Sequence, residues 1–175
     1  MSNTATIEKT ETQARGGKYL TFALGSEEYG LEILKVREIF GYMDITAVPH
    51  TPAYIKGVIN LRGQVISVID LRSRFDMPAV PRTEHTCIIV VEIKTEGRKI
   101  NMGIVVDRVS EVLNIPQTHI EDAPSFGVDL DTSFILGMGK INNRVKILLD
   151  IDRVLTRQDI SEMSAVAAEA AEAQA

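Results

Sequence analysis

Residues 30–39 have the sequence GLEILKVREI and align with residues 103–112, GIVVDRVSEV, at an offset of 73 positions. A second block repeats at an offset of 80, where Ile55, Gly57, Val65, Asp70 and Leu71 meet Ile135, Gly137, Val145, Asp150 and Ile151. Two blocks in the same order with matched glycines indicate an internal duplication into units of about 70 residues. Units this small have little core of their own, so we expect them to pack on each other along a seam that forms a groove.

Most of the chain between residues 19 and 155 carries strand signals. Short apolar and β-branched runs with Gly and Pro punctuation predict an all-β barrel or sandwich. The expected strands form hairpins over 19–33 and 86–106, with further strands at 64–71 and 145–149. Short helical pieces are expected only at 52–56, 72–75 and 152–155.

The repeat also assigns local roles to polar residues. Asp70 and Asp150 stand at equivalent positions after apolar strands, so we interpret them as caps of the following short helices and not as paired catalytic acids. Residues 60–63 and 140–143 are expected to be tight turns, because Gly and Asn tolerate positive φ. Arg62 has Asn142 as its repeat partner, and an arginine on a rigid turn is well placed to pair with a partner's carboxylate.

Composition excludes several classes of protein. The chain has 175 residues, 45% hydrophobic and 25% charged, with 5% aromatic and no tryptophan, which is typical of a soluble globular protein. We expect no signal peptide and no membrane span, and the single cysteine excludes an internal disulfide framework. Of the net charge of −5, residues 156–175 carry −3 and residues 18–155 carry −2. No basic block is present to neutralise phosphates, which argues against a nucleic-acid footprint.

The sequence offers no positive case for an enzyme, a metal site or a cofactor. The three histidines, His50, His85 and His119, lack metal-ligand spacing, and Cys87 in an apolar run is expected to be a buried structural thiol. The segment 129–131 resembles the start of a calcium loop but lacks the glycine and terminal glutamate, so we expect a solvated turn there. Nucleotide-binding and nucleophile-elbow motifs are missing from the sequence.

Five motifs in order carry a resemblance to a known family. They are YGLEILKVREI at 29–39, PAYIKGV at 52–58, NLRG at 60–63, VIDL at 68–71 and GIVVDRVSEVL at 103–113. The run from Tyr19 through Leu155 closely resembles the CheW family of bacterial chemotaxis coupling proteins. The resemblance implies two SH3-like five-stranded β-barrels packed side by side. It also implies a non-catalytic scaffold that links methyl-accepting chemoreceptors to the histidine kinase CheA.

The resemblance implies where the receptor binds. Carried over by motif match, the receptor-binding residues are Val36, Glu38, Ile39, Gly57, Arg62 and Val112, with Val112 facing the others across the seam. An apolar groove suits the apolar face of a receptor helix, and Glu38 and Arg62 can fix its register by charge. Core packing remains an alternative role for Val36, Ile39 and Val112, and a backbone requirement remains one for Gly57. The kinase-contact residues are unassigned.

The expected organisation has four parts. They are a flexible N-terminal tail over 1–18, barrel subdomains over 19–83 and 84–155, and a helical or disordered C-terminal tail over 156–175 that frays beyond Met163. The expected partners are the cytoplasmic hairpin tips of chemoreceptors and the regulatory domain of CheA. The chain alone is expected to be monomeric and cytoplasmic, recruited to membrane-bound receptor arrays. Two other readings stay open: a small barrel that binds RNA or a small ligand, and an enzyme with a site between the barrels.

Overall fold

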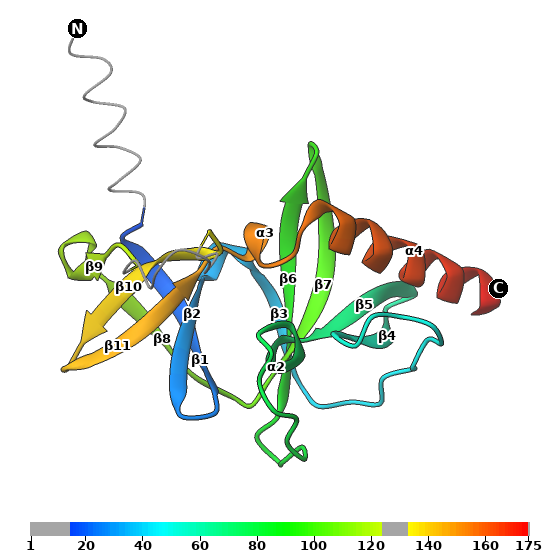
Figure 1. The fold of residues 1–175 in the computed structure, drawn as a ribbon, viewed down its shortest axis with the longest axis horizontal. Coiled ribbons are helices and arrows are strands. Elements are labelled where there is room, and N and C mark those ends of the chain that lie inside the picture. Colours follow the sequence, from blue (N-terminus) through cyan, green and yellow to red (C-terminus); the bar gives the residue numbers. More distant parts are fainter. Residues whose placement is uncertain (1–14, 124–132, 175) are drawn as a thin grey trace, which may run out of the picture.

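The computed structural model describes residues 15–123 and 133–174, which form two β-sheets and short helices (Figure 1). The six-stranded sheet has the order β8-β1-β2-β11-β10-β9. Its strands are β1 (Gly17–Leu24), β2 (Glu27–Glu32), β8 (Arg108–Ile115), β9 (Ile120–Glu121), β10 (Ile135–Ile141) and β11 (Arg144–Leu149). This sheet makes up the half of the molecule that carries the N-terminal end of the described chain (Figure 1).

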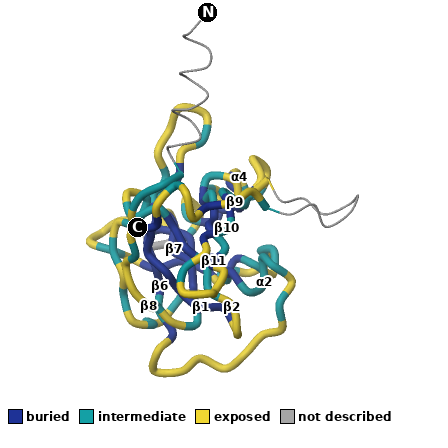
Figure 2. The backbone as a smooth tube through the Cα atoms, turned by 90° about the vertical axis from the view of Figure 1, so that its left-hand side faces the viewer, coloured by how far each residue is buried: buried dark blue, intermediate teal, exposed yellow. Residues whose placement is uncertain are grey.

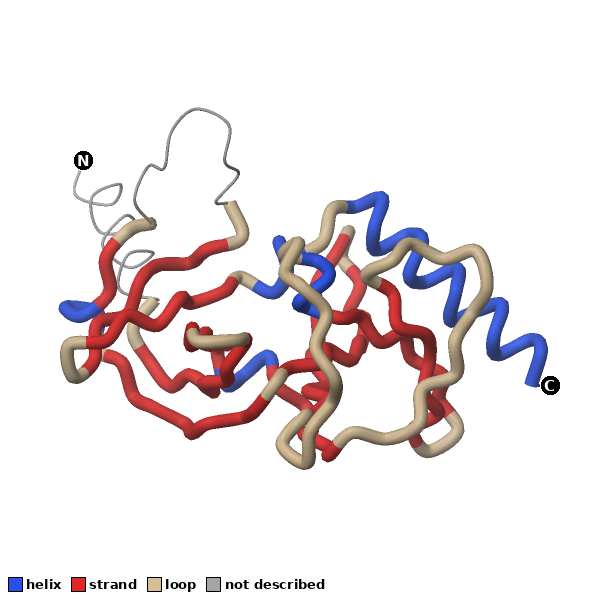
Figure 3. Tube along the Cα trace, turned by 60° about the horizontal axis from the view of Figure 1, so that its bottom comes forward, coloured by secondary structure: helices blue, strands red, loops and turns tan. Residues whose placement is uncertain are grey.

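The five-stranded sheet has the order β3-β6-β7-β5-β4. Its strands are β3 (Val36–Gly41), β4 (Ile55–Leu61), β5 (Gln64–Asp70), β6 (Cys87–Thr95) and β7 (Arg98–Val106). The short helices are η1 (Ile33–Lys35), α2 (Leu71–Arg74), η2 (Gln117–His119) and α3 (Ile151–Val154), and the long helix α4 (Arg157–Gln174) ends the chain. Figure 3 shows α4 running along the outside of the five-stranded half.

The two sheets match each other strand by strand. In order, β3, β6, β7, β5 and β4 correspond to β8, β1, β2, β11 and β10. The matched glycines Gly30 and Gly103 occupy the same place, because Gly30 pairs with Leu148 in the parallel β2–β11 contact and Gly103 pairs with Val68 in the parallel β7–β5 contact. The all-β prediction of two SH3-like barrels is confirmed, with β9 added to one of them.

The subdomain boundary expected at residues 83/84 does not follow the sheets. The N-terminal hairpin β1–β2 joins the sheet that holds β8–β11, and the hairpin β6–β7 joins the sheet that holds β3–β5. Each barrel therefore takes its hairpin from one repeat and its other three main strands from the other repeat. A repeat in sequence shows which segments are equivalent, whereas strand pairing decides which segments share a barrel.

Three clusters of buried side chains result from this arrangement. Each barrel has a small interior, one around Val68, Ile88 and Val90 and the other around Tyr19, Ile115 and Leu148. The largest cluster lies along the seam between the sheets and includes side chains from β1, β6, β7 and α4. Buried strands run through the middle of the molecule while the connecting loops are exposed (Figure 2). The expectation that the units pack on each other agrees with this seam core.

The local predictions can be compared with the structure one by one. Both hairpins form in the expected segments, and the carboxylates of Asp70 and Asp150 accept hydrogen bonds from the backbone of Arg72 and Asp152 at the starts of α2 and α3. The helix expected at 52–56 is wrong. Ile55 begins β4 opposite Ile69, because its side chain is buried in the seam core.

The C-terminal segment forms one helix from Arg157 to Gln174, which continues past Met163, where the sequence predicts fraying. Ile160, Met163 and Val166 are buried, and Ala170 packs against the same cluster. Their spacing places them on one helical face, which covers β4 and β5. The buried hydroxyl of Ser67 donates a hydrogen bond of 2.7 Å to the carbonyl of Met163.

Residues 1–14 of the expected N-terminal tail lie outside the described residues, but residues 15–18 are held in place. β1 begins at Gly17, and Arg15 donates a hydrogen bond of 2.6 Å to Asp122. The Tyr19 hydroxyl donates to the carbonyl of Arg15, and burial raises the pKa of Tyr19 to about 12. The turn expected at 129–131 also lies outside the described residues.

Candidate functional site

Strand β3 carries three of the expected receptor-binding residues at the free edge of the five-stranded sheet. Its pairing with β6 shifts by one residue between Val36 and Glu38, so a β-bulge lies at Arg37. Val36 packs against the seam core, whereas Ile39 keeps 44% of its surface exposed. Core packing thus accounts for Val36, and Ile39 is available on the surface.

Arg62 lies in the two-residue turn between β4 and β5. Arg62 and Gly63 have φ values of 52° and 85°, and Asn142 and Asn143 in the equivalent turn have 52° and 64°. Both segments are therefore the tight turns that the sequence predicts. Positive φ is unfavourable for an arginine, which lacks the local hydrogen bonds of asparagine.

The Arg62 side chain pairs within the chain. Its guanidinium donates to both carboxylate oxygens of Glu38, with Nη2 3.1 Å from Oε2, and this contact raises the pKa of Arg62. The pair joins β3 to the turn after β4, and these two strands are opposite edges of the sheet, so it helps to close the barrel. The guanidinium remains accessible, because 77% of the Arg62 side chain is exposed.

Gly57 is buried and has a backbone role. Its φ is +148°, and a Cβ atom there would overlap the carbonyl oxygen of Thr46, which accepts a hydrogen bond from the backbone of Val58. Gly137 has the same place in the other barrel, where a Cβ would lie 2.6 Å from Ile120. Both glycines allow a crossing segment to approach the strand closely, so the backbone requirement that the sequence left open is met at Gly57.

Val112 lies on β8, at the free edge of the six-stranded sheet and opposite Leu20 of β1. Half of its surface is exposed. The pairing of β8 with β1 contains a bulge, which the buried Thr21 hydroxyl closes by donating to the carbonyl of Glu111 and accepting from its N–H. Val112 is the repeat equivalent of Ile39, and the two residues lie on different sheets.

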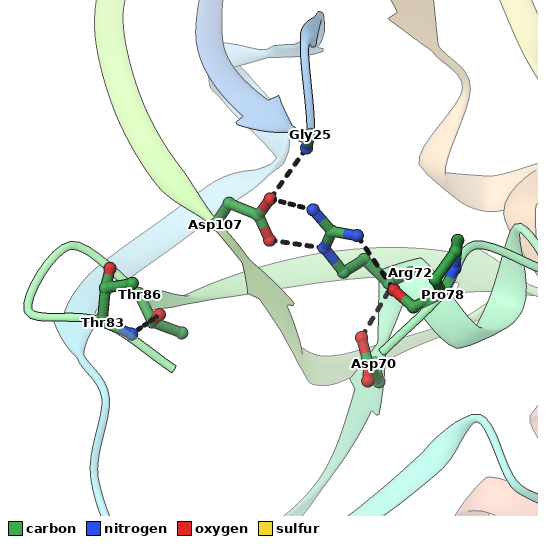
Figure 4. Close-up of polar contacts among 7 residues, drawn as sticks. All are labelled: Gly25, Asp70, Arg72, Pro78, Thr83, Thr86 and Asp107. Carbon is green, nitrogen blue, oxygen red and sulfur yellow. Dashed lines mark hydrogen bonds and ion pairs between the residues drawn. The ribbon is translucent and has the colours of Figure 1, made fainter. Parts of the chain in front are cut away.

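A polar clamp at the seam was missed by the sequence reasoning (Figure 4). Arg72 of α2 donates hydrogen bonds of 2.8 and 2.5 Å to Asp107, which lies between β7 and β8. The backbone N–H of Gly25, in the β1–β2 turn, also donates to Asp107 at 2.7 Å. The hydrogen bonds from Arg72 hold the pKa of Asp107 below its usual value. The one available signal was an acidic residue after the apolar run GIVV at 103–106.

The described residues were also compared with the sequence expectations for a metal site, a membrane span and a reactive cysteine. Within residues 15–123 and 133–174, the structure places no three potential metal ligands together, and no described helix is long and apolar enough to cross a membrane. Cys87 is only partly buried, not fully as expected, and its thiol donates to the carbonyl of His85 at 3.1 Å.

Comparison with known proteins identifies the family. The model of the CheW-like domain matches residues 18–159. This chain belongs to the CheW-like family. The chemotaxis protein CheW of Klebsiella aerogenes is 41% identical, covering 95% of this chain and 98% of that protein, and that of Bacillus subtilis is 37% identical, covering 86% and 93%. Scaffolding protein TtCheW from Thermoanaerobacter tengcongensis superposes with a TM-score of 0.71 at 36% identity, covering 82% of this chain and 95% of that chain.

Membership of the CheW-like family settles the general function. The chain is a non-catalytic chemotaxis adaptor that couples chemoreceptors to the histidine kinase CheA. This function takes the place of the two alternatives, which were a barrel that binds RNA or a small ligand and an enzyme with a site between the barrels.

Proposed function

We propose that the chain binds the cytoplasmic hairpin tips of chemoreceptors through a receptor surface made of Val36, Glu38, Ile39, Gly57, Arg62 and Val112. Two kinds of role divide these residues. Ile39, Arg62 and Val112 contact the receptor directly, whereas Val36 and Gly57 hold the backbone that presents them. Glu38 orients the Arg62 guanidinium by accepting two hydrogen bonds from it.

The observation that carries this proposal is the exposure of one repeat pair of apolar residues. Ile39 is 44% exposed and Val112 is 50% exposed, and each lies on the free edge strand of its sheet, shortly after a bulge. Exposure of β-branched side chains to water on an edge strand is unfavourable, so these side chains favour association with a partner that covers them. The apolar face of a receptor helix offers such cover.

The same proposal includes the kinase and the cellular location. CheA carries a regulatory domain that resembles this whole chain, and we propose that the two associate pseudo-symmetrically through the ends of their barrels. The kinase-contact residues remain unassigned. The chain works in the cytoplasm as a monomer that receptor arrays at the membrane recruit.

Co-sedimentation tests the receptor surface. Membranes that contain chemoreceptors are mixed with CheA and the chain, and both the bound fraction and the kinase activity are measured. We expect Ile39→Asp and Val112→Asp each to reduce bound chain by about tenfold, because a desolvated carboxylate opposes an apolar contact. Val80→Asp is the matched control, because Val80 is also 50% exposed but lies outside the receptor surface. Equal binding by all three variants would reject the surface.

A further inference from the structure

A cavity lies between the five-stranded barrel and the segment 77–86, which connects α2 to β6. Its volume is about 530 Å³, which is within the range of ligand sites in proteins. We call it the loop cavity and define it by Tyr42, Lys56, Arg72, Arg82 and Val105. None of the six residues of the receptor surface lines it.

The segment 77–86 is fixed at both ends, so the loop cavity has a defined outer wall. At its start, the Arg72 guanidinium donates a hydrogen bond of 2.9 Å to the carbonyl of Pro78. At its end, the backbone N–H of Thr83 donates to the hydroxyl of Thr86 at 2.8 Å, and the N–H of Thr86 donates to the carbonyl of Thr83 at 3.2 Å (Figure 4). The side chains of this segment are therefore held over the barrel.

Two cations in the lining have no acidic partner. Arg82 lies over the ring of Tyr42, with its guanidinium carbon 4.6 Å from the ring centroid, a contact that orients the guanidinium. Tyr42 is itself fixed, because its backbone N–H donates to the carbonyl of Thr86 at 3.0 Å. Lys56 is an exposed residue of β4 that lines the same cavity. Within residues 15–123 and 133–174, neither Lys56 nor Arg82 forms an ion pair.

The two carboxylates in the lining are engaged with Arg72. Asp107 accepts both guanidinium hydrogen bonds of the polar clamp, and Asp70 accepts the backbone N–H of Arg72 at 3.1 Å. The hydrogen bond to Asp107 is the main cause that raises the pKa of Arg72, and the charges of Asp107 and Asp70 add to it. The lining holds three basic and two acidic side chains, which leaves one positive charge in excess. Lys56 and Arg82 are the groups that remain to bind an anion.

The rest of the lining sets the kind of anion. Val80, Pro81 and Val105 form an apolar wall, and Val80 is 50% exposed. A carboxylate alone would leave this wall in water, whereas a hydrocarbon chain attached to it would cover Val80. A monoanion matches the single excess charge. A phosphate dianion would exceed it and would be repelled by Asp70.

We propose that the loop cavity binds an aliphatic carboxylate, with the carboxylate between Lys56 and Arg82 and the hydrocarbon chain against Val80 and Val105. The ligand is a free short-chain carboxylate or a glutamate side chain of a partner protein, and both present the same group to the cavity. Because the two cations belong to β4 and to the segment 77–86, the bound carboxylate joins these two elements.

Nitrogen-15 NMR titrations of the full chain test the proposal. Hexanoate is the free carboxylate, inorganic phosphate is the dianion, and the acetylated and amidated peptide Ala-Leu-Glu-Leu-Ala presents a glutamate side chain; ionic strength is kept constant. We expect saturable shifts of the backbone N–H signals of Arg82, Thr83 and Thr86 with hexanoate, with a Kd of about 1 mM. Phosphate should bind about tenfold more weakly. Tighter binding of the peptide with the same shifts would identify a protein side chain as the source, and tighter binding of hexanoate a free carboxylate.

Variants of the chain locate the binding. Lys56→Gln and Arg82→Gln are each expected to weaken hexanoate binding by about fivefold, because each removes a charged hydrogen-bond donor. Asp70→Asn should strengthen binding by about threefold, because it removes a like charge while asparagine still caps α2. Arg98→Gln is the matched control, because Arg98 is an exposed arginine of β7 outside the lining. Thermal unfolding verifies that each variant is folded, and any one of the three cavity variants is sufficient for the test.

Four outcomes would overturn the proposal. The first is absence of saturable hexanoate shifts in the segment 77–86. The second is unchanged affinity in both Lys56→Gln and Arg82→Gln, which would place the anion elsewhere. The third is an equal loss of affinity in Arg98→Gln, which would mean a general effect of net charge. The fourth is phosphate binding as tight as that of hexanoate, which would contradict a site for a monoanion with an apolar chain.

Discussion

Arg72 and Asp107 form a two-bond ion pair, with Nε and Nη2 donating to the two carboxylate oxygens at 2.8 and 2.5 Å. The pair joins α2 to the point where the chain crosses from the five-stranded to the six-stranded sheet. Asp107 also accepts from Gly25, and Arg72 also donates to the carbonyl of Pro78 at 2.9 Å. One carboxylate therefore fixes the crossover, the β1–β2 turn and α2 relative to one another.

Asp107→Asn is expected to destabilise the fold by about 1–3 kcal/mol at neutral pH. The asparagine amide is uncharged and has one oxygen, so it cannot accept both hydrogen bonds from the Arg72 guanidinium. The folded-state pKa of Asp107 is lowered, so its stabilisation is present above the pKa of the unfolded carboxyl, about 4. It is lost as the pH falls through the folded-state value. Urea unfolding from pH 7 to pH 2 measures both effects. Equal acid sensitivity of the two proteins would contradict the assignment.

Gly57→Ala is expected to unfold the barrel or to lower its free energy of unfolding by about 3 kcal/mol or more. A Cβ atom there would overlap the carbonyl of Thr46, and the φ of +148° is strained for alanine. Gly41→Ala is the matched control, since a Cβ atom there has nothing within 4 Å. Thermal denaturation and soluble yield report the difference. A stable Gly57→Ala protein that fails to bind receptor would instead give Gly57 a direct contact.

Arg62 is tested by two substitutions. Arg62→Asn copies Asn142 of the equivalent turn and suits a φ of 52°, so we expect full stability and weakened receptor binding. Arg62→Glu places a second carboxylate beside Glu38 and should weaken receptor binding further. Because exposed ion pairs contribute little, its thermal midpoint should change by less than about 4 °C. Co-sedimentation and thermal unfolding measure the two properties, and unfolding of Arg62→Asn would assign the arginine to the fold alone.

Much of the fold is encoded locally and could be predicted. The hairpins, the tight turns at Arg62 and Asn142 and the caps at Asp70 and Asp150 all depend on residues a few positions apart. The duplication also predicted the packing of two units along a seam. These features follow from sequence period, turn chemistry and repeat spacing.

Features that depend on distant pairing could not be predicted in this way. The exchange of the β1–β2 and β6–β7 hairpins between barrels leaves both repeats unchanged in sequence, so the repeat alone gives no preference between the exchanged and unexchanged arrangements. The partners of Arg62 and Asp107 likewise lie 24 and 35 residues away in the chain. The packing of α4 on the barrel was not predicted, because its composition is rich in alanine and the contact depends on a few residues of one face. These residues are Ile160, Met163 and Val166.

Deletion of residues 164–175 is expected to destabilise the chain while leaving kinase activation intact in arrays kept below the new melting point. The deletion removes Val166, which is 8% exposed, and the packing of Ala170. Loss of a buried valine alone costs about 1.5–3 kcal/mol. Deletion of 172–175 removes the exposed Glu172 and is the control. Unchanged unfolding of the longer deletion would show that α4 contributes no stability beyond Met163.

The ion pair between Lys146 and Glu28 favours the pairing of the β1–β2 hairpin with the barrel that contains β11. Lys146 of β11 is only 8% exposed and pairs with Glu28 of β2, which also accepts a hydrogen bond from Ser110 of β8. The equivalent of Lys146 in the other barrel is Ile66, a member of that barrel's apolar interior. The hairpin β1–β2 therefore brings a carboxylate that only the barrel with Lys146 can satisfy. Pairing it with β5 would set Glu28 against an isoleucine.

The two halves of this ion pair should respond unequally to substitution. Glu28→Ala is expected to lower the free energy of unfolding by about 3–5 kcal/mol, because it leaves the Lys146 ammonium buried without its partner. Lys146→Ile should be neutral or stabilising, since it fills the position as Ile66 does and Glu28 retains access to water. If the pair selects the hairpin, Lys146→Ile will fold more slowly or yield domain-swapped dimers despite its stability. Stopped-flow refolding and gel filtration measure this, and an unchanged rate with a pure monomer would assign the selection to the apolar core.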